Sequence, residues 1–221
     1  MDRTKRALAI VIALKAEYPD LRPLLDFRNP FQLLIAVILS AQTTDAQVNQ
    51  ITPALFRRFP TPEDLAGAEV AEIEALVHST GFFRTKARNI KGAAGAIVAK
   101  HAGRIPDSMD ELVALPGVGR KSANVILSHI YGRPGIIVDT HFSRVVRRLG
   151  LSAEKEPERI ERDVDSFLPA KVQTDFSMAV NYHGRYCCIA RSPACYRCVV
   201  ASLCEFSPKN VEQPLQLEKR K

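Results

Sequence analysis

The sequence lacks several patterns that mark particular protein classes. No segment alternates between apolar and polar residues over several positions, so half-buried β-strands are not expected. The longest uncharged apolar run, residues 30–39, is too short to cross a bilayer. The first 15 residues carry charges on both sides of a short amphipathic segment, so we expect no secretory signal. There is no internal repeat. These absences predict an intracellular protein without strands.

The composition is that of a folded and basic protein. Of the 221 residues, 46% are hydrophobic and 25% are charged, and this balance argues against a disordered chain. The formal net charge of +7 favours an anionic partner, and nucleic acid is the commonest partner of that kind. The alternative is a charge that serves only solubility.

Helical patterns fill the chain and predict an all-α fold. Thr44 with Gln47 fits the capping box, in which side chains satisfy unpaired amides at a helix start. Ser108 with Glu111 fits it as well. From such signals and from glycine stops we expect helices at 3–17, 31–39, 45–58, 62–66, 69–77, 84–101, 109–114, 120–131, 140–149, 156–167 and 172–185.

Five cysteines need an explanation, because a reducing compartment does not favour a disulfide framework. Four of them follow the spacing C-x6-C-x2-C-x5-C, namely Cys188, Cys195, Cys198 and Cys204. Thiolates this close can converge on one metal centre, and four thiolates suit both tetrahedral zinc and an iron–sulfur cluster. Free thiols are the remaining alternative. Cys187 is expected to be a small buried hydrophobe, because neighbouring side chains point in different directions.

The segment LPGVGRKSANVIL, residues 115–127, predicts a tight glycine turn followed by a helix. Gly117 and Gly119 permit backbone angles forbidden to other residues and let a phosphate approach the main chain. The amides at the start of the helix would then point at that phosphate, aided by the helix dipole. A plain connection between two helices is the alternative.

Lys121 lies in the first turn of that expected helix. The helix dipole, the neighbouring Arg120 and partial burial would all disfavour its charged form, and a neutral amine is a nucleophile. Asp139 is the candidate carboxylate that takes a proton and faces a developing sugar cation. Its alternative role is a helix cap, which Thr140 could equally provide.

These segments together resemble a known family. LPGVGRKSANVIL, then VDTHFSRVVRRLGL at 138–151 and the cysteine spacing, are similar to the endonuclease III family of base-excision DNA glycosylases. ILSAQTTD at 38–45 and GFFRTKARNI at 81–90 match further family segments. The resemblance extends from about residue 5 to 206 in the family's order.

The resemblance implies a helix–hairpin–helix fold of two all-α lobes with a DNA groove between them. One lobe, residues 22–133, would be a six-helix barrel containing the hairpin. The other, residues 1–21 plus 134–221, would carry a [4Fe–4S] cluster on Cys188, Cys195, Cys198 and Cys204. We expect a monomer in the bacterial cytoplasm, associated with the nucleoid through DNA binding.

The resemblance further implies a bifunctional DNA glycosylase and abasic-site lyase that removes oxidised pyrimidines, such as thymine glycol, from duplex DNA. Lys121 would be the nucleophile that forms a Schiff base with the sugar before β-elimination, and Asp139 its carboxylate partner. The residues expected to contact DNA are Gln42, Phe82, Arg84, Gly117, Val118, Gly119, Arg120, His141 and Arg144.

Two of these positions would act inside the duplex. Gln42 matches the family residue that fills the gap left by a flipped base, and its alternative role is a polar residue at a helix end. Phe82 matches a bulky apolar wedge, although sequence alone favours a core phenylalanine there. Basic residues recur at helical spacing in two stripes, with a solvated helix face as the alternative to DNA contact: Arg84, Arg88 and Lys91, and Arg144, Arg147 and Arg148.

The chain departs from the family at Val113, where many relatives carry a glutamate, and this puts the lesion range in doubt. Three other functions compete. Adenine glycosylases lack the lysine and carry a glutamate at the place of Val37. A non-catalytic DNA-binding module would not need Lys121 with Asp139. An electron-transfer protein would need no hairpin or basic stripes.

Overall fold

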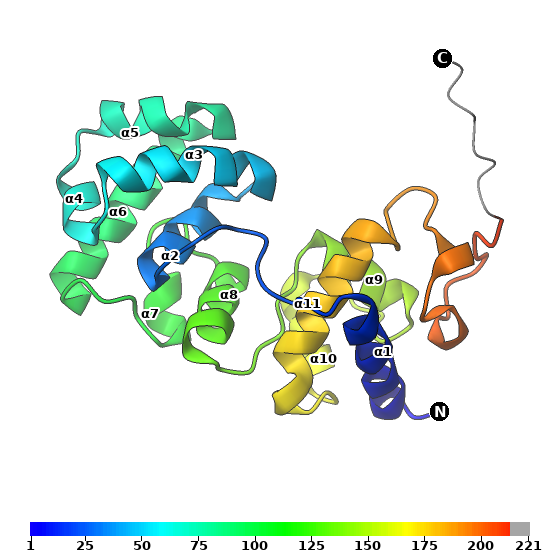
Figure 1. Ribbon diagram of the computed structural model, residues 1–221. Helices are drawn as coiled ribbons and strands as arrows, with labels where there is room; N and C mark the ends of the chain where they lie inside the picture. The colour runs from blue at the N-terminus through cyan, green and yellow to red at the C-terminus, as the bar shows by residue number, and fades with distance from the viewer. Residues whose placement is uncertain (213–221) are drawn as a thin grey trace, which may run out of the picture. The chain divides into compact units, whose positions relative to one another are not determined.

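The computed structural model describes residues 1–212, and these residues are helical without a single strand (Figure 1). The all-α prediction is therefore confirmed. The chain forms two compact units, one of Met1–Arg22 with Pro134–Lys221 and the other of Pro23–Arg133. Within the described range, no helix is both long and apolar enough to traverse a lipid bilayer.

The unit formed by Pro23–Arg133 is built around α2 (Pro30–Leu39). This helix is apolar all round, and an element without a polar face must lie inside its domain. Leu33, Leu34 and Ile35 are fully buried. α2 packs against α3 (Asp45–Arg58), α6 (Phe83–His101) and α8 (Arg120–Tyr131). The unit also contains α4 (Pro62–Gly67), α5 (Val70–Val77), the single-turn helix η1 (His78–Thr80) and α7 (Met109–Val113).

The unit formed by the two chain ends has its own core, in which α11 (Ala170–Tyr186) packs against α1 (Arg3–Glu17) and α9 (Thr140–Arg148). The rings of Phe142 and Phe176 meet edge to face with centroids 5.9 Å apart. A side chain at Gly184 would place its Cβ 2.9 Å from that of His141, so α9 and α11 approach closely only because of this glycine. The remaining elements are α10 (Pro157–Asp165), η2 (Cys195–Arg197) and η3 (Ala201–Leu203).

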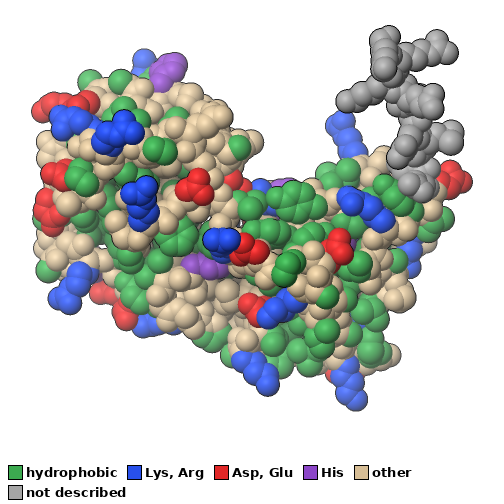
Figure 2. Space-filling view, in the orientation of Figure 1, with side chains coloured by type: hydrophobic (Ala, Val, Ile, Leu, Met, Phe, Trp, Pro, Cys, Tyr) green, Lys and Arg blue, Asp and Glu red, His purple; other side chains and the backbone are tan. Residues whose placement is uncertain are grey.

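Each α-helix expected from the sequence is present, and its ends lie within two residues of the expected ones. The single-turn helices η1, η2 and η3 were not predicted, because a run of three residues carries no periodic signal. On the face drawn in Figure 2, Lys and Arg side chains lie among Asp and Glu side chains. The excess positive charge therefore forms no continuous basic patch on that face.

Candidate functional site

The connection between α7 and α8 is a tight turn that requires one of its two glycines. The amide of Val118 donates to the carbonyl of Leu115 at 3.1 Å and closes the turn. Gly117 has a φ of +79°, and a Cβ there would lie 2.9 Å from Ile38 Cγ2. Both the backbone angle and the packing against α2 therefore exclude a larger residue at this position.

Gly119 does not adopt the glycine-specific backbone angles that the sequence predicted. Its φ of −96° and ψ of 175° are extended angles that any residue adopts. The space that a Cβ would fill at Gly119 is open. The residue precedes α8, and in the described part of the chain no side chain caps that helix start. Gly119 thus exposes main chain and helix amides, while the side chain of Val118 is buried.

Lys121 lies in the first turn of α8 and is exposed, so the expected partial burial is wrong. The buried face of α8 begins only at Ala123, because the first turn projects beyond the core of the unit. Arg120 is exposed as well. The amine of Lys121 is therefore accessible to a large ligand.

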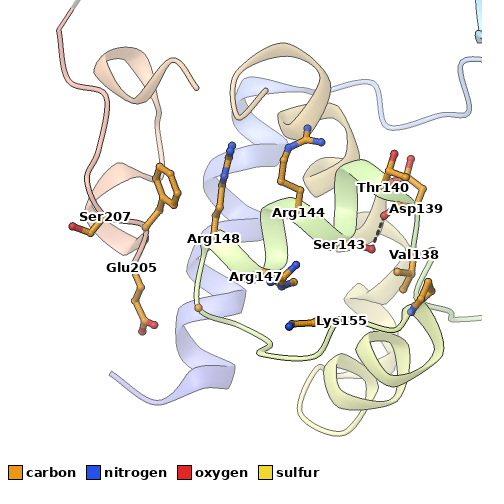
Figure 3. Close-up of a pocket in the computed structure, with 13 residues that line it drawn as sticks. Val138, Asp139, Thr140, Ser143, Arg144, Arg147, Arg148, Lys155, Glu205 and Ser207 are labelled. Carbon is orange, nitrogen blue, oxygen red and sulfur yellow. Dashed lines mark hydrogen bonds between the residues drawn. The ribbon is translucent and has the colours of Figure 1, made fainter. Parts of the chain in front are cut away.

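Asp139 is the cap of α9, and Thr140 is the first residue of the helix. Its Oδ1 accepts a hydrogen bond from the amide of Phe142 at 2.7 Å. The side-chain amide of Asn181 donates to Oδ2. The carbonyl of Asp139 accepts from the Ser143 hydroxyl at 2.7 Å (Figure 3). The amide of Phe142 and the side chain of Asn181 hold this half-buried carboxylate in one orientation.

The two catalytic candidates belong to different units. Lys121 lies in Pro23–Arg133, and Asp139 lies in the unit of the two chain ends. The hairpin brings Lys121 together with Gly119 and Arg120, whereas Asp139 shares its unit with the cysteines.

Gln42 and Phe82 share an unusual conformation. Both are exposed and both have a left-handed backbone, with φ of 54° at Gln42 and 47° at Phe82. The Phe82 residue is 69% exposed, so the core position that sequence alone favours is wrong. A positive φ in a bulky residue stores strain, and such residues cluster at functional sites.

The basic stripe on α6 serves two purposes. Arg84 and Arg88 are exposed, and the Arg84 guanidinium lies 5.4 Å from the centre of the Phe83 ring. The ammonium of Lys91 instead donates to the carbonyl of Ala68 at 2.6 Å, which ties α6 to the end of α4. Only the first two cations of this stripe remain available to a partner.

The stripe on α9 is divided in the same way. Arg144 donates to the carbonyls of Cys188 and Gly184 at 3.1 and 2.7 Å, and its Nη2 lies 3.3 Å from His141 Nδ1. Helical spacing alone does not reveal this supporting role. Arg147 is exposed and lines an open pocket with Lys155, which the stripe pattern did not include (Figure 3).

The four expected metal ligands line one cavity, together with Cys187 and His183. Arg148 donates to Cys188 Sγ at 3.3 Å and to the carbonyls of Ile189 and Ala190 at 2.8 and 2.9 Å. Burial raises the pKa of the Cys188 and Cys204 thiols, so their thiolate forms need a positively charged partner. A metal centre would supply that charge, and the donor set fits one.

Two residues beside this cavity were not expected to approach the ligands. Nitrogen and sulfur atoms of His183, Cys187 and Cys198 lie within 4.8 Å of one another, a group that could hold a metal. Cys187 is buried as expected, and its sulfur lies close to that of the expected ligand Cys198 and to the ring of His183. His183 is only 2% exposed. It precedes Cys187 by four residues, and this spacing was the sequence signal that both side chains lie on the same helix face.

Comparison with known proteins agrees with this architecture. The chain matches the HhH-GPD superfamily of base excision DNA repair proteins over residues 35–170. Endonuclease III of Synechocystis sp. is 49% identical over 203 residues, which are 91% of this chain and 93% of the relative.

Two solved structures are similar over nearly the whole chain. A non-covalent endonuclease III–DNA complex has a TM-score of 0.88 and 39% identity, with 93% of this chain and 96% of that one covered. A trapped covalent endonuclease III–DNA intermediate has a TM-score of 0.87 and 39% identity, with coverages of 93% and 97%. The chain therefore belongs to the endonuclease III family of the HhH-GPD superfamily.

Proposed function

We propose that this protein is a bifunctional DNA glycosylase and abasic-site lyase of base-excision repair, with oxidised pyrimidines in duplex DNA as its substrates. The observation that carries the proposal is the exposed Lys121, placed directly after a glycine turn at the start of a helix. A family member of 39% identity has been trapped covalently on DNA, which supports the same chemistry here.

Damage recognition would begin at Gln42 and Phe82. An enzyme that acts on a base must flip it from the stack, and a lesion that stacks poorly lowers this cost. Gln42 would fill the gap that the flipped base leaves, and Phe82 would wedge the opposite strand. Their exposure and strained backbones support these roles, because both side chains already project away from the core.

The hairpin would hold the DNA backbone. The open space at Gly119 admits a phosphate to the amides of the α8 start, where the helix dipole favours negative charge. Such contacts position DNA without reading its sequence. The further proposed DNA contacts are those of Arg84, Arg120, His141 and Arg144. Arg144 would contact DNA while it keeps its hydrogen bonds to the carbonyls of Cys188 and Gly184.

The chemical step would use Lys121 as a neutral amine. Its Nζ attacks the sugar at C1′, the bond from C1′ to the base breaks, and the base leaves with the bonding pair. Loss of a proton from nitrogen and opening of the sugar ring give a Schiff base, and β-elimination then breaks the bond to the 3′ phosphate. The carboxylate of Asp139 would face the developing positive charge on the sugar and take up the proton.

The cavity of Cys188, Cys195, Cys198 and Cys204 would hold a [4Fe–4S] cluster in the unit of the two chain ends. Such a cluster cross-links the loop that follows α11 and so contributes folding energy. Arg148 would hold this loop through its carbonyls and would balance the negative charge on the Cys188 sulfur.

The two units would correspond to the family's lobes. Residues 23–133 would be the barrel lobe with the hairpin, and residues 1–22 with 134–221 the lobe that carries the cluster. We propose that the protein acts as a monomer on duplex DNA in the bacterial cytoplasm, where the nucleoid lies.

The proposal is tested with duplexes that each contain one defined oxidised pyrimidine. The protein is expected to release thymine glycol, to cut the strand, and to form a covalent adduct with DNA when borohydride is present. Asp139→Asn is expected to slow base release by about 100-fold, because the carboxylate charge is lost. Asparagine still caps the helix, but its NH2 group faces the Asn181 donor, so the melting temperature should fall slightly through loss of that one hydrogen bond. Equal activity of this variant would assign Asp139 the capping role alone.

Gly119→Ser distinguishes a phosphate cradle from a plain connection between helices. Serine adopts the same extended backbone and caps helix amides, so we expect the free energy of unfolding to rise by about 0.3 kcal/mol. Because its side chain fills the space meant for a phosphate, affinity for duplex DNA should fall by about 10-fold. Thermal melting and fluorescence anisotropy measure the two effects.

Gly117→Ala should lower stability, in contrast to Gly119→Ser. Its positive φ and the clash with Ile38 should cost about 1 to 3 kcal/mol of stability. If Gly119→Ser bound DNA as tightly as the unchanged protein, the hairpin would be a connection only.

A further inference from the structure

Lys86 is a buried cation on the core-facing side of α6. The residue is 4% exposed and lies on the same helix face as Ala87 and Ile90, which are fully buried. Its position in the first helical turn is unfavourable for a cation, and burial lowers the pKa of its amine. Within the described residues its ammonium contacts no carboxylate. A group placed at such cost calls for an explanation beyond packing.

The contacts of Lys86 form a closed triangle of hydrogen bonds. Its ammonium donates to the hydroxyl of Thr43 at 2.5 Å and to the carbonyl of Thr80 at 2.7 Å. The Thr43 hydroxyl donates to the same carbonyl at 2.5 Å. One cation thus joins the loop after α2 to the end of η1, two segments that are 37 residues apart in the chain.

These two segments carry the residues that would probe DNA. Gln42 directly precedes Thr43, and Phe82 follows Thr80 by two residues. The side-chain amide of Gln47, in the first turn of α3, donates to the Ser79 hydroxyl at 2.8 Å and adds a second link between η1 and the chain that follows Thr43. Strained backbones persist only where the surroundings determine them strongly, and the triangle supplies that restraint at Gln42 and Phe82.

We propose that Lys86, through Thr43 and Thr80, couples the two loops so that Gln42 and Phe82 enter the duplex as one unit. Lys86 is then a positioning residue, buried out of reach of the DNA, that acts through the two exposed side chains. The inference rests on the proposed function, because coupling matters only to an enzyme that flips a base. A residue that merely stabilised this unit would affect all activities alike.

Thr43→Val tests the coupling, since it removes the central hydroxyl and keeps the side-chain shape. Release of thymine glycol from a duplex should fall by about 10-fold, the effect of losing one hydrogen bond to a charged group. Borohydride trapping on single-stranded DNA with an abasic site needs Lys121 but no base replacement, so its yield should change less than about two-fold. Thr43→Ser restores the hydroxyl and should recover the duplex reaction.

Lys86→Met is the second variant, and Lys100→Met, at an exposed position on the same helix, is its matched control. Lys86→Met should show the same selective loss as Thr43→Val, and Lys100→Met should show none. Equal losses on the two substrates, or an unchanged duplex reaction in Thr43→Val, would overturn the coupling. If the unchanged protein gave no adduct on either substrate, the proposed function itself would be overturned.

A double substitution measures the coupling directly. In the unchanged background, Gln42→Ala with Phe82→Ala should lose no more duplex activity than the more harmful single change, because the probes act as one unit. In the Thr43→Val background the two losses should multiply, as they do for independent sites. Multiplying losses in both backgrounds would contradict the inference.

Discussion

Lys121→Ala is expected to abolish strand scission and the borohydride-trapped adduct on DNA that contains thymine glycol. Removing a nucleophile removes the covalent intermediate, so single-turnover base release should slow by at least about 10³-fold. The side chain is exposed in the first turn of α8, whose buried residues begin at Ala123, so the variant should fold normally. Gel separation of the cleaved strand and circular dichroism measure the two quantities.

Lys121→Arg is the matched control for charge. Its guanidinium stays protonated and keeps a cation at the helix start, but it is not a nucleophile at neutral pH. DNA affinity should therefore stay close to that of the unchanged protein while scission is lost. Scission that survives in Lys121→Arg would show that Lys121 contributes only positive charge.

Cys188→Ala is expected to lose bound metal and Cys187→Ala to keep it, although the two residues are adjacent. Loss of Cys188, a ligand in the proposed cluster, should remove iron and the yellow-brown absorbance that such a cluster would give, and should lower the melting temperature. Arg148 donates to the carbonyls of Ile189 and Ala190 in the loop that follows α11, and a metal centre would add directly to the folding energy of this loop. Cys187→Ala should retain the iron, because Cys187 lies outside the expected ligand spacing.

Iron and zinc analysis of the two purified variants checks this prediction. A colourless protein with one zinc ion would replace the iron–sulfur assignment by a zinc site, since both metals accept four thiolates. If Cys187→Ala lost the metal and Cys188→Ala kept it, the group of His183, Cys187 and Cys198 would be the true ligand set.

Local chemistry explains why the helices could be predicted so closely. Thr44 and Ser108 each accept a hydrogen bond from the amide three residues later, which is the first half of the expected capping box. The second half fails in both, because the Gln47 amide donates to Ser79 and Glu111 accepts from the Ser108 hydroxyl. Helix starts depend on neighbours in sequence, whereas the direction of a long side chain depends on tertiary partners.

Tertiary partners also explain what the sequence analysis missed. Lys86 occupies a position of α6 at which the helical repeat places apolar residues, and this charged residue on the apolar face was the sequence signal for its burial. The exposure of Phe82 depends on a left-handed backbone that composition does not encode. Arg144 and Arg148 have the spacing of a solvated face, yet they donate to carbonyls that are 40 and 42 residues away in the chain.

Peptide mapping of the trapped complex identifies the amine that bonds covalently to deoxyribose, which we propose is that of Lys121. The protein is mixed with a thymine glycol duplex and borohydride, digested, and analysed by mass spectrometry. We predict one modified peptide, with the reduced sugar attached at Lys121. A sugar attached at another lysine or at the N-terminus, or cleavage without any adduct, would contradict it.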